Sequence, residues 1–224
     1  MPASVMCVGL LAWAIGRPIL RLKGHALAMA TLGFGIIVSI VLATEDRWTG
    51  GPDGMAVVSL FQGEKTWYWI VAGALLAAVW FALNLIDSPR GRALRALHGS
   101  EVAAQSLGID AAAHKLSAFV LSALYAAAAG ALSAHYSGFI TPAKSSFLHS
   151  VELVTMVVFG GMASTFGAVV GAALLTTLPQ LLTVFKEYEM VVFGAVMMLT
   201  MILMPRGLVP TLESLLAAAR RRPE

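Results

Sequence analysis

Charged residues are scarce in this chain of 224 residues: only 12% are Asp, Glu, Lys or Arg, whereas 58% are hydrophobic. The mean hydropathy is +0.82. About a quarter of the residues of a soluble domain are charged. This chain therefore has about half the fraction of charged residues that is typical of a soluble domain. Segments of about ten residues with alternating polarity are also missing, which disfavours a transmembrane β-barrel. We expect an all-α fold, a polytopic bundle of transmembrane helices.

Cysteine and catalytic motifs are equally sparse. The single Cys7 excludes a disulfide framework and a cysteine metal cluster. No G-x-x-x-x-G-K-[ST] phosphate-binding loop, H-E-x-x-H motif or nucleophile elbow occurs. We therefore predict that the chain is no enzyme, holds no metal or cofactor, and depends on another subunit for any use of ATP. The histidines lie near loop or helix ends, where interfacial or capping roles are expected.

Long apolar runs dominate what is present. A helix needs about 20 apolar residues to cross about 30 Å of hydrocarbon. The hydrophobic segments are Ala3–Gly16, Ala26–Ala43, Thr66–Ile86, Leu116–Tyr136, Val151–Val184 and Met190–Met204. We predict a transmembrane domain over residues 1–210, followed by a basic cytoplasmic tail over residues 211–224.

Lysine and arginine divide unevenly among the loops, and this asymmetry predicts the orientation. Eleven of the fifteen lie in residues 17–25, in residues 87–115 and in the C-terminal region. The other four lie in residues 44–65, 137–149 and 185–189. The positive-inside rule places the first group, and with it the C-terminus, in the cytoplasm. Because orientation accounts for the basic residues, they imply no nucleic-acid partner.

The segment Val151–Val184 fits this orientation only if it enters from outside, turns at Gly160–Gly161 and returns outward. Its first limb, of about 10 to 12 residues, is too short to cross the bilayer. It is therefore either a re-entrant half-helix on a substrate path or a plain hairpin with a tight glycine turn. The first segment would start outside without a preceding helix. We therefore expect the chain to lack an N-terminal portion.

Glu152 is the one acidic residue close to the apolar core, and an acid there is a candidate for the substrate path. We expect it in the first turn of the half-helix, where the helix dipole alone would stabilise it. The G-x-x-x-G pair Gly167 and Gly171 favours close helix packing, either within the chain or in a dimer.

The loop 87–115 is the most informative polar segment. Ser88 is a good N-cap and Pro89 a good first helical residue, so a short helix should begin there and end at Gly99. This helix would carry two leucines on one face and three arginines: Leu94, Leu97, Arg90, Arg92 and Arg95.

A second short helix is expected after Ser100, with Glu101 in its first turn, where a carboxylate suits the helix dipole. Gly108 would stop this helix and Asp110 would cap the next membrane helix. Its smooth side would consist of Ala103 and Ala104. Two capped helices between membrane spans indicate either docking to another protein or an interfacial anchor on anionic lipid. The residues alone leave both open.

The segment Gly91–Asp110 resembles the cytoplasmic loop of the membrane subunits of branched-chain amino acid ABC transporters, the Liv permeases. Further matching stretches follow the same order: Arg21–Gly35, Thr49–Gly54, Ala134–Pro142, Val157–Gly167 and Met204–Leu208. The resemblance covers nearly the whole chain and is strongest to the LivM type. The family's N-terminal helices would precede Ala3.

The resemblance implies that this loop couples the permease to ABC ATPase subunits, which bind the ATP. The coupling positions would be Arg92, Leu94, Leu97, Glu101, Ala103, Ala104 and Gly108. Val102 separates the glutamate from the alanines, which in many other importers follow it directly. Further implied partners are a second permease subunit, a periplasmic or extracellular substrate-binding protein and the lipid bilayer. The outer loop at Thr49, Gly50 and Gly51 would dock the binding protein, shape the outer gate, or form only a tight turn.

Three functions compete. The first is the permease subunit of an ATP-driven importer in the bacterial inner membrane, for branched-chain or related hydrophobic amino acids, or alternatively for urea or short amides. The second is an ion-coupled secondary transporter, which needs buried acids, and Glu152 is the single candidate. The third is a membrane-embedded enzyme, which the missing catalytic motifs disfavour.

Overall fold

The computed structural model of the protein describes residues 2–22, 24–58, 63–162, 164–182 and 207–211, together with residues 194, 198 and 202. Helices account for most of these residues, which confirms the all-α expectation. The chain divides into two compact units, residues 1–146 and residues 147–224. Apart from single positions, the predicted segment Met190–Met204 and the predicted tail 211–224 lie outside the described residues.

Four long helices form the first unit: α1 (Pro2–Ile19), α2 (His25–Thr44), α4 (Glu64–Asp87) and α7 (Ala111–Ser137). Each is long and apolar enough to cross a membrane, which confirms the first four predicted segments. The helix α1 continues past the predicted end at Gly16. The Leu20 N–H still donates to the Gly16 carbonyl at 2.9 Å, and the Arg17 guanidinium lies 5.3 Å from the centre of the Trp13 ring.

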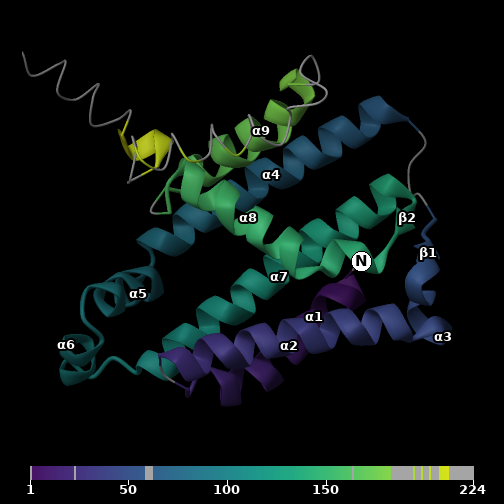
Figure 1. The fold of residues 1–224 in the computed structure, drawn as a ribbon. Helices are drawn as coiled ribbons and strands as arrows, with labels where there is room; N and C mark the ends of the chain where they lie inside the picture. Colours follow the sequence, from purple (N-terminus) through teal and green to yellow (C-terminus); the bar gives the residue numbers. More distant parts are fainter. Residues whose placement is uncertain are drawn as a thin grey trace, which may run out of the picture. The chain divides into compact units, whose positions relative to one another are not determined.

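Short elements connect the long helices of this unit. At one end lie α3 (Asp46–Thr49), η1 (Gly51–Asp53), β1 (Met55–Ala56), β2 (Phe139–Ile140) and η2 (Pro142–Ser145). The strands β1 and β2 pair antiparallel, with Met55 opposite Ile140 and Ala56 opposite Phe139. At the other end of α4 and α7 lie α5 (Pro89–Gly99) and α6 (Glu101–Ser106), as Figure 1 shows.

The helix α1 packs along α7, and small residues allow the approach (Figure 1). Gly9, Ala12 and Gly16 are the buried residues of α1. A Cβ atom at Gly9 would lie 2.8 Å from Leu124 Cδ2, and one at Gly16 would lie 2.8 Å from Phe119 Cδ1. In lipid the hydrophobic effect does not drive helices together, so close packing at small residues stabilises such a pair.

The second unit contains α8 (Phe147–Gly160) and α9 (Thr165–Leu182). These helices are bent by 119° at the break between them, which follows the predicted Gly160–Gly161 turn. A Cβ at Gly160 would lie 1.8 Å from the Gly167 carbonyl oxygen, and one at Gly171 would lie 2.2 Å from that of Met156. The G-x-x-x-G pair thus packs α9 against α8 within the chain, one of the two predicted uses.

Candidate functional site

Residues 88–110, here called the helical linker, join α4 to α7 through α5 and α6. The Ser88 side chain accepts a hydrogen bond from the Gly91 N–H at 3.2 Å and starts α5. The Ser100 side chain accepts one from the Ala103 N–H at 3.3 Å and starts α6. Asp110 Oδ1 accepts from the N–H groups of Ala112 and Ala113 and starts α7. All three predicted caps are confirmed, each satisfying amides that have no partner inside the helix.

The helix α5 is fastened to the end of α4. Arg92 Nη1 donates to the Asp87 carbonyl at 2.8 Å, and Arg95 Nη2 donates to the Ile86 carbonyl at 2.9 Å. The last carbonyls of a helix lack intrahelical partners and carry the negative end of its dipole, so guanidinium groups stabilise them. Arg92, predicted as a coupling position, therefore holds α5 on α4.

Gly108 ends α6, as predicted. Its N–H donates to the Gln105 carbonyl at 3.0 Å, and the Ile109 N–H donates to the Ala104 carbonyl at 3.1 Å. This pair of bonds is the Schellman motif, which requires a left-handed residue. Gly108 has a φ of +83°, a conformation that costs glycine little. The reversal returns Ile109 to the apolar side of the linker.

A small core holds the linker together. Leu97, Ala104 and Ala111, which are 8%, 2% and 5% exposed, form its centre, and Leu94 and Ile109 pack against them. The predicted coupling positions Leu94, Leu97 and Ala104 therefore stabilise the linker internally.

Ala103 and Ala104 were expected to form one smooth side of α6, and the structure corrects this. Ala103 is exposed whereas Ala104 is buried, because successive helical residues point about 100° apart. Two large apolar side chains are exposed here instead, Val102 within α6 and Leu107 at its C-cap, each 80% exposed and here called the α6 apolar patch. The sequence signal for it was the valine that interrupts the glutamate–alanine spacing.

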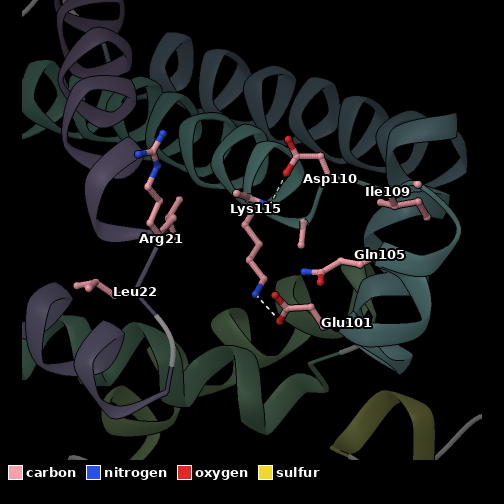
Figure 2. A pocket seen from close by; sticks show the side chains of 11 residues that line it. Arg21, Leu22, Glu101, Gln105, Ile109, Asp110 and Lys115 are labelled. Atoms are coloured by element: carbon pink, nitrogen blue, oxygen red, sulfur yellow. Dashed lines mark hydrogen bonds and ion pairs between the residues drawn. The ribbon is translucent and has the colours of Figure 1, made fainter.

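Glu101 makes a contact that the sequence did not reveal. Its Oε2 atom lies 2.7 Å from Nζ of Lys115, and the two side chains are 36% and 38% exposed. Lys115, assigned to the polar loop from the sequence, lies within α7. The ion pair lines a pocket of about 410 Å³ that Arg21 and Gln105 also line. Figure 2 shows Arg21 across this pocket from Gln105, so the α1–α2 connection and α6 share one end of the unit.

Glu152 lies in the second turn of α8, which corrects its expected place in a first turn. The helix begins at Phe147, directly after the extended Ser146, so Glu152 is its sixth residue. Its Oε2 atom lies 3.2 Å from Nδ1 of His149, and its side chain is 55% exposed. Gly160 and Gly161 lie at the far end of α8, at the bend.

The loop that is predicted to face outside, here called the outer loop, forms a tight turn at Thr49–Gly51, as its residue types indicate. Thr49 Oγ1 donates to the Leu42 carbonyl at 2.9 Å. Gly50 follows in a left-handed conformation and Gly51 begins η1. The loop is held by the β1–β2 pair and by a 2.8 Å hydrogen bond between His135 Nδ1 and the Val58 carbonyl.

These features define a polytopic helical membrane protein with a capped, fastened linker between two of its spans. The model of the family described as "Branched-chain amino acid transport system / permease component" matches residues 1–201. The chain belongs to this permease family, which confirms the resemblance seen in the sequence.

Individual relatives of this chain are likewise named as permease proteins of branched-chain amino acid transport systems. The chain is 35% identical to the high-affinity branched-chain amino acid transport system permease protein LivM of Salmonella typhimurium, over 94% of this chain and 56% of the relative. The LivM protein of Escherichia coli gives the same values. The permease protein LivH of Salmonella typhimurium is 30% identical over 88% of this chain and 68% of its own length.

The chain spans 56% of the length of the two LivM proteins. Its relatives are transport permeases and not enzymes, as expected for this chain. No solved structure matches it.

Proposed function

We propose that this chain is the transmembrane permease subunit of an ATP-driven importer for branched-chain or related hydrophobic amino acids. It acts in the bacterial inner membrane by alternating access, driven by separate ABC ATPase subunits that bind the ATP. A second permease subunit and a substrate-binding protein outside the membrane complete the assembly. The family description and the names of the relatives support the substrate class.

The α6 apolar patch carries the proposal. Val102 and Leu107 expose two large apolar side chains on a linker that Arg92 anchors to α4 and that Ala104 packs against Ala111 of α7. The linker helices are 11 and 6 residues long, too short to span a membrane. We assign these exposed apolar side chains to contact with the ATPase, because the family resemblance implies that this loop couples the permease to ATPase subunits.

Two contacts support the predicted sidedness. The connection at Arg21 and the helical linker line one pocket, and the charge asymmetry assigns both to the cytoplasm. The strands β1 and β2 pair at the other end, and the same asymmetry assigns both of their loops to the outside. The C-terminus would accordingly lie in the cytoplasm.

The test places a charge in the patch. Val102→Asp should abolish co-purification of the ATPase, because an aspartate cannot be desolvated against an apolar surface without a partner. Val58→Asp is the matched control, since Val58 is also a valine, 85% exposed, in a loop predicted to face outside. Undiminished ATPase capture by the Val102→Asp permease would contradict the proposal, and so would equal loss in both variants.

A further inference from the structure

We propose that Lys115 is a positioning residue, which holds Glu101 and thereby α6 against α7, so that a movement of α6 is passed to α7. This inference rests on the proposed function and assigns a role within it to a residue outside the predicted coupling set. Its basis is the 2.7 Å contact between Lys115 Nζ and Glu101 Oε2, which joins two helices across 14 residues of sequence.

An ionic contact and an apolar contact lie side by side between α6 and α7. Glu101 and Ala104 are three residues apart on α6, and Ala111 and Lys115 are four residues apart on α7. Residues at these spacings lie on one face of a helix. Ala104 and Ala111 form the apolar contact and Glu101 and Lys115 the ionic one, about one turn further along. Two contacts of this kind resist rotation of α6 about its axis, whereas the alanine contact alone would allow it.

Through α7, these contacts connect the α6 apolar patch with the far end of the unit. The patch residues Val102 and Leu107 are each 80% exposed, and Val102 lies about 160° around α6 from the buried Ala104, so both are accessible to a partner. The helix α7 runs without interruption for 27 residues, about 40 Å. At its far end His135 bonds the outer loop, and β2 follows directly. A displacement of α6 by the ATPase would therefore reach the outer loop through one continuous helix.

The pair is suited to positioning more than to stability. Both side chains are more than one-third exposed, and ion pairs of this exposure stabilise proteins weakly. Removing the lysine charge should leave folding and assembly intact and loosen the orientation of α6. We therefore expect weaker coupling between substrate-binding protein and ATP hydrolysis, while the amount of folded and assembled permease stays the same.

The experiment measures how far loaded substrate-binding protein stimulates ATP hydrolysis by the complete importer in proteoliposomes. Lys115→Met, which keeps the length and removes the charge, should lower the stimulation about two- to fivefold, the range of partly exposed ion pairs. Lys115→Arg should restore it. Arg21→Met is the matched control, because Arg21 lines the same pocket outside the ion pair and should leave the stimulation unchanged.

A double-variant cycle separates positioning from independent effects. If Lys115 acts through Glu101, adding Lys115→Met to Glu101→Gln should cause no further loss. Additive losses, or normal stimulation in Lys115→Met, would overturn the inference. So would a Lys115→Met permease that no longer assembles with the ATPase, since this would make the residue structural. Failure of the unaltered importer to hydrolyse ATP on stimulation would instead contradict the proposed function.

Discussion

Replacing Leu97 by alanine should loosen the helical linker without unfolding the membrane helices. Leu97 is 8% exposed in a core whose other two buried members are alanines. Truncation of a buried leucine costs about 2 to 5 kcal/mol, depending on how far the site can collapse. The linker core is small and close to solvent, so we expect the lower end, about 2 kcal/mol.

Hydrogen exchange followed by mass spectrometry measures this loss directly in detergent-solubilised protein. If the linker opens as a local unit, a loss of about 2 kcal/mol accelerates exchange of its amides about 30-fold. Peptides of α4 should change little, because Leu97 is not part of that helix. Val102→Ala, at an 80% exposed position of the same linker, is the control and should leave exchange nearly unchanged. Equal protection in Leu97→Ala and unaltered protein would refute the small-core description.

Two other predictions concern helix contact and the outer loop. Gly171→Leu should destabilise the second unit by about 1 to 3 kcal/mol through overpacking and lower the thermal midpoint of aggregation. Gly130→Leu, at a helical glycine with open space around it, should not, and equal midpoints for the two would contradict the packing. His135→Ala removes the bond to the Val58 carbonyl, worth about 1 kcal/mol, and should speed protease cleavage of the outer loop about fivefold. His149→Ala is its control, and unchanged cleavage in His135→Ala would count against that bond.

Local signals in the sequence predicted the linker well. A cap depends on one side chain and the amides two or three residues after it, so Ser88, Ser100 and Asp110 could each be identified from their own neighbourhoods. The stop at Gly108 is equally local, because its left-handed conformation follows from the residue type. The long apolar runs likewise predicted four helices that are long and apolar enough to cross a membrane.

Contacts between elements were beyond such reasoning. The ion pair between Glu101 and Lys115 depends on how α6 folds back on α7, and no spacing rule connects residues 14 apart. The burial of Ala104 and exposure of Ala103 depend on which side of α6 meets Ala111. Glu152 was placed in a first turn because the apolar run begins at Val151, whereas the helix begins at Phe147. Tertiary packing determines the ion pair and the burial of Ala104, and the earlier helix start determines the position of Glu152 in α8. Hydropathy alone predicts none of these.

The most direct measurement of the central claim is uptake of radiolabelled leucine into proteoliposomes that hold this permease with its second permease subunit and ATPase. The account predicts accumulation that requires both enclosed ATP and external substrate-binding protein, and that Val102→Asp abolishes while Val58→Asp does not. Accumulation driven by an ion gradient without ATP would contradict it.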